Sequence, residues 1–418
     1  MPKGTLRDAR AVKLLFGLCW AAYFTTYLGR LNYAACLVEI TNTEGWTKGQ
    51  AGLIATGFFA AYGCGQLVNG FVGDKLSPKI MVALGLGASG AINLIFPLLP
   101  NAGLATAVWC VNGFVQSMVW SPLVRLIAEW MPMENRLKAC VNLNSTVPVG
   151  TLVTYGLSAV LVYLGNWKLV FYISGICLLV MTAFWLWELQ RLENQLDPVV
   201  KEQTEDVLEV TKHASIWKLA LASAVPLCCI ALMMQGVLKD GVTTWIPTFL
   251  EERFDLTAAA AILSTTVVPI VNLGGVYLAS WINKKCFHNE LVTASVFFAT
   301  GGIALALLIF FPNSSAVFSL LLLALTTTFM MGINTLLVSM MPAYYARYGV
   351  CSSMSGILNA SAYIGSALSS YGNGAVVERF GWNSIMYIWC ICAAIGVLVC
   401  AFAMKRWHRF SSTAIKTE

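Results

Sequence analysis

Two cationic residues lie in apolar stretches far apart in the chain, and their types suit the binding of an anion. Arg30 follows the segment YLG, and Lys239 lies 209 residues later in LKDGVTTW. A charge at the centre of a membrane span costs about 2.5–3.5 kcal/mol on insertion scales, which marks such residues as functional. Arg offers a planar bidentate fork, and Lys acts as a point charge. We therefore expect Arg30 and Lys239 to bind a small anion such as a phosphate.

Polar and aromatic residues accompany Arg30 at helical spacing. Tyr23, Tyr27 and Arg30 are separated by four and three residues, which places them on one face of a helix. Tyr62 and Gln66 form an i,i+4 pair in the next apolar stretch. Contact with a ligand and ordinary helix packing explain these side chains equally well at this point.

Carboxylates stand near two of the cations inside the apolar stretches. Asp240 follows Lys239 directly, and adjacent helical residues point about 100° apart, so the sequence predicts a poorly placed pair. We expect Asp240 to face another helix or water instead, and to serve as the coupling group if protons are used. Arg125 precedes Glu129 by four residues, a spacing that predicts an ion pair on a helix surface and a gating or structural role.

The elements that position these residues are membrane spans. The 418 residues are 58% hydrophobic and 11% charged, whereas soluble domains are about a quarter charged. Because a helical span needs roughly 20 apolar residues, the hydropathy excludes a soluble fold. The sequence predicts twelve spans, at 14–38, 50–72, 79–99, 104–130, 139–163, 168–189, 217–250, 258–282, 290–311, 316–342, 353–377 and 383–404.

The distribution of basic residues predicts the orientation of these spans. With both termini cytoplasmic, nineteen of the 26 Lys and Arg residues fall in the termini and loops of the cytoplasmic side, and only four fall outside. This asymmetry is the positive-inside bias. The net charge of +6 is therefore an orientation signal, and we expect the bilayer rather than nucleic acid as the partner of this basic chain.

Internal repetition divides the chain into two similar halves. The polar stretch at 190–216 separates six predicted spans in 1–189 from six in 217–418, and it reads as a cytoplasmic linker. Arg30 and Lys239 differ by 209 residues, and the Met-Pro pairs at 131–132 and 341–342 differ by 210. Nearly equal offsets predict parallel repeats, between which such transporters bind their substrate near the bilayer midplane.

Enzyme, metal and cofactor functions find no support in the motifs. The thirteen Cys residues lie mostly in apolar runs, where Cys acts as a small hydrophobe, and they show no metal-binding or redox spacing. The sequence contains no nucleophile–base pair and no Gly-rich nucleotide loop. We therefore expect neither a metal nor a cofactor, and no enzymatic activity.

Four segments carry a resemblance to a known family. GFVGDKLSPK at 70–79 resembles the signature loop of the major facilitator superfamily, while YLGRLNYAA, WSPLVRLIAEW and LKDGVTTWIPTFL are similar to its organophosphate:phosphate antiporter family. The resemblance covers essentially the whole chain. It implies an all-α membrane protein with twelve transmembrane helices in two six-helix, pseudo-symmetric halves. The expected function is secondary active exchange of glycerol-3-phosphate or a hexose phosphate for inorganic phosphate by alternating access.

The resemblance also implies roles for individual residues. The expected substrate contacts are Arg30, Lys239, Tyr23, Tyr27, Tyr62, Gln66, Asn144 and Tyr363. The expected gating residues at the cytoplasmic rim are Asp74, Arg125, Glu129 and Arg136. Three positions depart from relatives: Gln66 stands where Lys is frequent, Val147 where His occurs, and Lys239 where glycerol-3-phosphate carriers have Arg.

Two rival functions remain open from the sequence. A proton-coupled sugar-acid symporter resembles the chain in its first span, but such symporters place Asp where Gly29 stands, and Asp240 is the one carboxylate at span depth. A membrane receptor for a sugar phosphate is the second rival, because one branch of the family has that function. For any of the three functions we expect a multi-pass monomer in the cell (inner) membrane.

Overall fold

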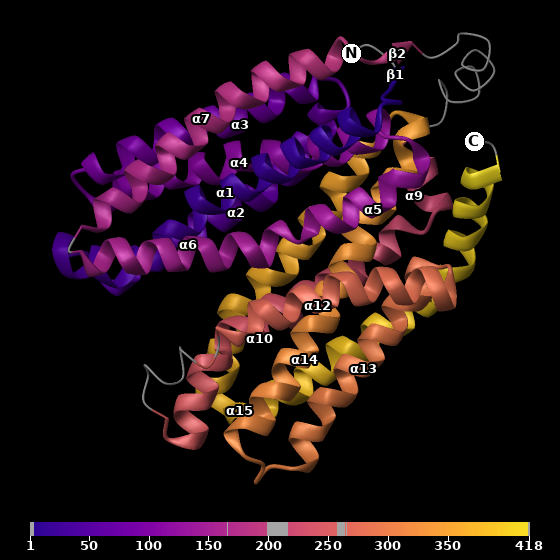
Figure 1. Ribbon diagram of the computed structural model, residues 1–418. Coiled ribbons are helices and arrows are strands. Elements are labelled where there is room, and N and C mark those ends of the chain that lie inside the picture. The colour runs from indigo at the N-terminus through magenta and orange to yellow at the C-terminus, as the bar shows by residue number, and fades with distance from the viewer. Residues whose placement is uncertain (1–3, 165, 199–215, 257–263, 265, 417–418) are drawn as a thin grey trace. The chain divides into compact units, whose positions relative to one another are not determined.

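A computed structural model describes residues 4–164, 166–198, 216–256, 264 and 266–416, and these residues are almost entirely helical (Figure 1). The first part of the chain contains β1 (Gly4–Thr5), α1 (Ala9–Glu44), α2 (Lys48–Gly73), α3 (Pro78–Ile95), η1 (Phe96–Leu98), α4 (Ala102–Trp130), α5 (Met133–Asn144), α6 (Thr146–Tyr163), α7 (Trp167–Glu193) and β2 (Asp197–Pro198). The second contains α9 (Ile216–Ala222), α10 (Val225–Phe254), α12 (Val267–Ile282), η3 (Asn283–Phe287), α13 (Glu290–Phe310), α14 (Ala316–Asn334), η4 (Thr335–Met340), η5 (Met341–Tyr348) and α15 (Cys351–Lys416).

The chain forms two compact units. Unit 1 comprises Met1–Ala214 together with Tyr345–Ile357, and unit 2 comprises Ser215–Tyr344 together with Leu358–Glu418. The start of α15 therefore belongs to unit 1, and the rest of that helix belongs to unit 2. The predicted linker at 190–216 lies for the most part outside the described residues.

Unit 1 is a bundle in which α2 runs along α4, α3 along α4 and α7, and α1 along α6 and α7 (Figure 1). Local capping explains where these helices begin. Thr47 and Gln50 form a capping box at the start of α2, and the Asn101 side chain accepts a hydrogen bond from the Leu104 amide at the start of α4. Caps of this kind satisfy backbone groups that would otherwise be unbonded at the helix ends.

Unit 2 is arranged around α14, which packs against α10, α12 and α13. Backbone breaks separate its helices. Ala224 adopts a left-handed conformation between α9 and α10, and Gly381 interrupts α15 at φ 76°. A glycine is suited to Gly381 because it has no Cβ to clash in that region of φ. The break therefore divides α15 into two helical segments.

The described helices match the predicted spans. Ten of them are long and apolar enough to cross a membrane. The predicted span 258–282 begins among residues outside the description and is seen as α12 from Val267, while 353–377 and 383–404 share α15 on either side of Gly381. The predicted span 139–163 corresponds to two helices, because α5 ends at Asn144 and α6 begins at Thr146.

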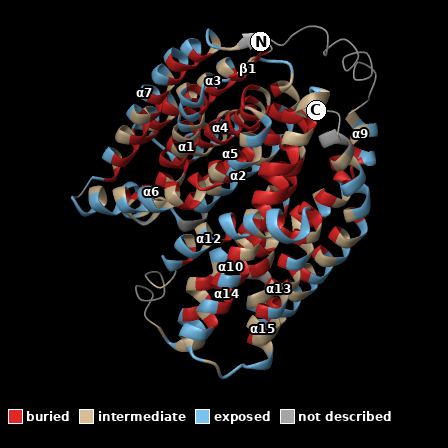
Figure 2. Cartoon of the chain, turned by 45° about the vertical axis from the view of Figure 1, so that its right-hand side comes forward, coloured by how far each residue is buried: buried red, intermediate tan, exposed pale blue. Residues whose placement is uncertain are grey.

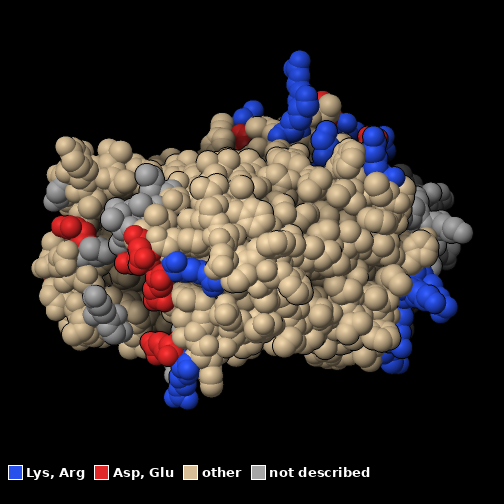
Figure 3. All heavy atoms as spheres, turned by 90° about the horizontal axis from the view of Figure 1, so that it is seen from below, with Lys and Arg blue, Asp and Glu red and all other residues tan. Residues whose placement is uncertain are grey.

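The outer surface of the helices is apolar, as a membrane protein requires. Helices such as α3 and α7 bury one face and expose the other (Figure 2). Leu84 is 54% exposed, Val180 63% and Phe402 74%. Figure 3 shows a broad area without Lys, Arg, Asp or Glu, and the charged side chains gather toward its margins. Exposed leucine, valine and phenylalanine on a charge-free surface fit contact with lipid tails.

Candidate functional site

Arg30 lies in unit 1 inside a group of tyrosine rings. Its side chain is 8% exposed. The guanidinium carbon lies 3.8 Å from the ring centroid of Tyr27, 5.5 Å from that of Tyr62 and 5.6 Å from that of Tyr23. A guanidinium within about 6 Å of a ring face is attracted by the quadrupole of the ring. The structure thus brings together four of the residues predicted to contact substrate, and three of them hold the cation without cancelling its charge.

Neighbouring helices fix the tyrosines in place. A Cβ on Gly150 of α6 would lie 2.7 Å from the Cβ and ring of Tyr27, so the glycine is what lets α6 approach that ring. The ring of Trp120 on α4 lies 4.7 Å from the ring of Tyr23, centroid to centroid. Tyr23 and Tyr27 also meet edge to face, with centroids 5.6 Å apart. Packing of this kind restricts the rotamers of both tyrosines.

Several buried polar atoms of unit 1 have no hydrogen-bond partner within the described residues. Among them are both amide atoms of the Gln66 side chain, the Trp120 indole nitrogen and the Ser121 hydroxyl. Leaving such groups unsatisfied costs free energy. Gln66 was predicted to contact substrate, whereas Trp120 and Ser121 were not. Both of these residues stand in the WSPLVRLIAEW segment.

A network of uncharged side chains lies directly behind Arg30. The carbonyl of Gly29 accepts hydrogen bonds from the Asn93 Nδ2 at 3.1 Å and from the Asn112 Nδ2 at 3.0 Å. Ser89 donates to the Asn112 Oδ1 at 2.7 Å, and Gln116 donates to the Ser89 hydroxyl at 2.8 Å. All four of these side chains are buried. The network ties α1, α3 and α4 together one residue before Arg30, so it positions the backbone that carries the guanidinium.

Gly29 itself leaves no room for a side chain. A Cβ there would lie 2.4 Å from the Leu178 Cδ1 and 3.0 Å from the Asn93 Nδ2. An aspartate at this position, as in the sugar-acid symporters, would therefore collide with both groups. Sequence inspection missed the network, although Ser89 and Asn93, like Asn112 and Gln116, stand four residues apart inside apolar spans.

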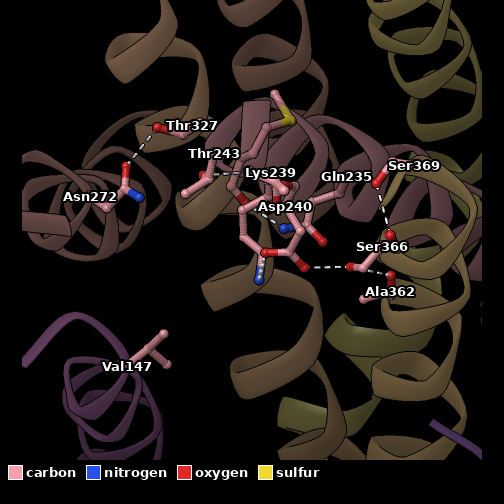
Figure 4. Close-up of polar contacts among 12 residues, drawn as sticks. Val147, Gln235, Lys239, Asp240, Thr243, Asn272, Thr327, Ala362, Ser366 and Ser369 are labelled. Carbon is pink, nitrogen blue, oxygen red and sulfur yellow. Dashed lines mark hydrogen bonds and ion pairs between the residues drawn. The ribbon is translucent and has the colours of Figure 1, made fainter. Parts of the chain in front are cut away.

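Lys239 lies in unit 2 next to a carboxylate (Figure 4). Its Nζ is 3.1 Å from the Asp240 Oδ1, and the other carboxylate oxygen of Asp240 accepts a short hydrogen bond from the Ser366 hydroxyl of α15. The predicted separation of Lys239 and Asp240 is wrong, because a long Lys stem can bend toward its neighbour despite the 100° step between adjacent residues. The expectation that Asp240 faces another helix is confirmed by its bond to Ser366.

Close packing of α10 on α15 brings Asp240 to Ser366. A Cβ on Gly236 would lie 2.1 Å from the Ala362 carbonyl oxygen, and one on Gly365 would lie 2.0 Å from the Met233 carbonyl oxygen. Small residues at such positions let two helix backbones approach each other. Gln235 lies one turn before Lys239, and its side-chain Nε2 donates to the Met330 carbonyl at 3.0 Å. This hydrogen bond links α10 to α14 as well. The Lys239–Asp240 pair therefore lies on a helix, α10, that is held by contacts with both α15 and α14.

The two remaining predicted contacts lie on helices of the two units. Asn144 is buried at the end of α5, and Tyr363 is half-buried on α15. Val147, where relatives have a His, lies one helical turn after that end, near the start of α6. Their contact with a ligand stays a prediction.

Three of the four predicted gating residues, Asp74, Arg125 and Glu129, lie near the end of α2. The Arg125 Nε lies 2.7 Å from the Glu129 Oε1, so the i,i+4 ion pair is confirmed, and the Arg125 guanidinium also donates to the carbonyls of Gly73 and Leu76. The Asp74 carboxylate accepts hydrogen bonds from the backbone amides of Ser352 and Ser353, at the start of α15. A negative charge at a helix N-terminus is favourable, because it faces the positive end of the helix dipole. The Arg136 Nε donates to the Met131 carbonyl at 2.9 Å.

Burial raises the pKa of the Asp74 carboxyl above its ordinary value, while the hydrogen bonds from Ser353 and Ser352 and the charge of Arg125 lower it. The net direction is upward, so protonation of Asp74 is easier than in water. Because the two amide donors favour the charged form, Asp74 binds α15 most strongly when it is ionised.

The described residues contain no group of three His, Cys, Asp or Glu side chains that could hold a metal ion. The cations described above lie in different units, Arg30 in unit 1 and Lys239 in unit 2. A guanidinium and an ammonium each suit the oxygens of a small anion.

Comparison with known proteins supports this description. Residues 19–354 match the family model of the Major Facilitator Superfamily. The chain is 23% identical to the membrane sensor protein UhpC of Escherichia coli over 91% of this chain and 89% of that protein. It is 26% identical to the glycerol-3-phosphate transporter of Bacillus subtilis over 86% and 85%. The solved structure of the proton:xylose symporter XylE is similar in fold, with a TM-score of 0.74 at 15% identity over 95% of this chain and 96% of that one.

Proposed function

Because the chain belongs to the major facilitator superfamily, we propose that it is a secondary active transporter that exchanges a small organophosphate for inorganic phosphate. The superfamily consists of membrane transporters rather than enzymes. The candidate substrates are glycerol-3-phosphate and a hexose phosphate. Similarity to a glycerol-3-phosphate transporter over most of both chains supports the phosphate-bearing class of substrate.

The observation that carries the proposal is the environment of Arg30. A buried guanidinium surrounded by tyrosine rings retains its positive charge, because cation–π attraction stabilises the cation without neutralising it. The unsatisfied donors of Gln66, Trp120 and Ser121 belong to the same unit. A phosphate offers the charge that a guanidinium requires and several oxygens that accept from neutral donors.

Exchange follows if the buried charge of Arg30 makes reorientation of the empty transporter unfavourable. An unloaded transporter leaves Arg30 in a medium of low dielectric constant, and a bound phosphate offsets that cost. Each change of orientation then requires an anion, so uptake of one phosphate compound depends on exit of another. In this proposal Asp74, Arg125, Glu129 and Arg136 belong to a cytoplasmic gate that holds one orientation. Both termini are cytoplasmic, and the protein acts as a monomer in the cell (inner) membrane.

Transport into proteoliposomes tests the proposal. Vesicles loaded with inorganic phosphate should accumulate labelled glycerol-3-phosphate or glucose-6-phosphate, and phosphate-free vesicles should not. Lys168→Gln is a matched control, because it removes a cation from an ion pair with Glu44 at the surface of unit 1. That variant should transport normally. Equal uptake with and without internal phosphate would contradict exchange.

A receptor is the second candidate, because the chain is similar to a membrane sensor protein over nearly its whole length. A receptor should bind the sugar phosphate without moving it across the membrane. Binding of labelled glucose-6-phosphate by purified protein that shows no flux in loaded vesicles would favour this function.

Proton-coupled symport is the third candidate, and the carboxylate of Asp240 beside Lys239 is the observation that favours it. Uptake into phosphate-free vesicles, driven by a pH gradient and lost in Asp240→Asn, would support symport and contradict exchange.

A further inference from the structure

The Lys239–Asp240 pair lies at the middle of a membrane-spanning helix, and both of its charged side chains are partly exposed. The two residues stand at the middle of α10, which spans Val225–Phe254. The Lys239 side chain is 22% exposed and that of Asp240 is 37% exposed. Charged side chains at mid-span face protein or a water-filled cavity rather than lipid tails. Their exposed fraction therefore indicates water, and a dissolved anion can reach the Lys239 ammonium.

We propose that Asp240 is a built-in counter-anion, whose carboxylate occupies Lys239 when no substrate is bound and competes with a substrate phosphate for the same ammonium group. The inference rests on the proposed function, and it adds a regulatory element to the binding site. It also gives the two adjacent charges opposite effects on affinity, since Lys239 attracts the substrate and Asp240 opposes it.

The geometry supports competition rather than joint binding. The Asp240 Oδ1 lies 3.1 Å from the Lys239 Nζ. A phosphate oxygen bound to the ammonium would occupy the same position. A phosphate that joined the pair without displacing it would lie close to a carboxylate, and like charges at such a distance repel each other. Release of Asp240 from Lys239 is therefore part of binding.

Ser366 provides a second holding point for the displaced carboxylate. Its hydroxyl donates to the Asp240 Oδ2 and lies on α15, whereas Lys239 lies on α10. When a phosphate replaces the carboxylate as the partner of the Lys239 ammonium, Asp240 can keep its hydrogen bond to Ser366. The freed carboxylate oxygen can then be hydrated, because the side chain is partly exposed. The carboxylate thus has one state bound to Lys239 and Ser366 and another bound to Ser366 alone.

The test is the affinity of purified protein for inorganic phosphate, measured by scintillation proximity with labelled phosphate. Asp240→Asn keeps the size of the side chain and removes its charge, so phosphate should bind about five-fold more tightly. Ser366→Ala removes the hydrogen bond that the displaced carboxylate keeps, so it should weaken phosphate binding, and it should have no effect in the Asp240→Asn background. If Asp240 had a merely structural role, its replacement would weaken phosphate binding or leave it unchanged.

Glu44→Gln is the matched control, because it removes one negative charge from an ion pair with Lys168 in unit 1 and should leave the affinity unchanged. Equal or weaker phosphate binding by Asp240→Asn, or tighter binding by Ser366→Ala, in protein that melts at the wild-type temperature, would overturn the inference while exchange by the wild type stands. Absence of phosphate binding in the wild type and in Asp240→Asn alike would overturn the proposed function and this inference with it.

Discussion

Arg30 lies in unit 1 and Lys239 in unit 2, and the protein stabilises their charges in different ways. The Arg30 guanidinium rests on the rings of Tyr23, Tyr27 and Tyr62, whereas the Lys239 ammonium is paired with the carboxylate of Asp240. Aromatic rings stabilise a cation and leave its charge in place, while a carboxylate cancels it. The two units therefore differ in how far the surroundings of the cation neutralise its charge.

The two cations also differ in how rigidly the surrounding residues hold them. The backbone before Arg30 is fixed by buried amide side chains that bond the Gly29 carbonyl. The side chains of Lys239 and Asp240 are 22% and 37% exposed, and the Ser366 hydroxyl bonds the carboxylate. A rigid site gives strict geometry, and an exposed pair can rearrange. We therefore expect changes at Arg30 to affect transport more than changes at Lys239.

Replacing Arg30 by Lys should have the largest effect. The substitution keeps the positive charge and removes the bidentate fork, together with the stacking of a planar group on Tyr27. We expect phosphate exchange to fall roughly a hundred-fold, as for the loss of charge-assisted hydrogen bonds. Initial rates in phosphate-loaded proteoliposomes provide the measurement. Exchange within three-fold of the wild type would remove the distinction between the two cations.

Replacing Lys239 by Gln should lower the affinity for phosphate about ten-fold, because Asp240 is then left unpaired beside the site and repels the anion. The double variant Lys239→Gln/Asp240→Asn should recover most of that loss. A double-mutant cycle on phosphate binding measures the coupling between the two residues. Additive effects would show that the pair does not act as one unit.

Replacing Gly29 by Ala should damage unit 1 moderately. The new Cβ would press on Leu178 and Asn93, and overpacking of this kind costs about 1–3 kcal/mol. We expect a lower melting temperature and exchange reduced by a few fold, because the backbone that carries Arg30 moves. Gly17→Ala is the control on the same helix, since a Cβ there meets nothing within 4 Å. Equal melting temperatures for the two variants would argue against a positioning role for the network.

Replacing Lys239 by Arg should have the smallest effect. The charge remains, Asp240 can still pair with it, and the longer fork alters the shape of the site. We expect phosphate exchange within about three-fold of the wild type. The preference between glycerol-3-phosphate and glucose-6-phosphate should shift, and competition between the two labelled substrates measures it. A loss as large as that of Arg30→Lys would make Lys239 an equally strict element of the site.

Local spacing was sufficient to predict which side chains gather around Arg30. The intervals between Tyr23, Tyr27 and Arg30 place them on one helical face, and the structure confirms that the rings meet the guanidinium. The ion pair of Arg125 and Glu129 follows from the same rule. Spans were predictable because twenty apolar residues in a row have few alternatives to a membrane helix.

Contacts between distant helices could not be predicted in this way. The bonds to the Gly29 carbonyl join three spans, and no spacing within one span reveals which carbonyl Asn93 and Asn112 will reach. The Lys239–Asp240 pair was missed because helical geometry fixes where Cβ atoms point but not how a four-carbon stem bends. Ser366, 126 residues further along the chain, holds the Asp240 carboxylate as well.

The support behind Arg30 consists of amides and a hydroxyl, none of which carries a charge or exchanges a proton in the physiological range. A membrane potential acts on charges with about 2.3 kcal/mol per elementary charge and 100 mV, so it exerts little force on this neutral support. The side chains that position the backbone next to Arg30 therefore respond little to the membrane potential. We expect any voltage dependence of transport to originate in the cations themselves and in the charge of the ion that is carried.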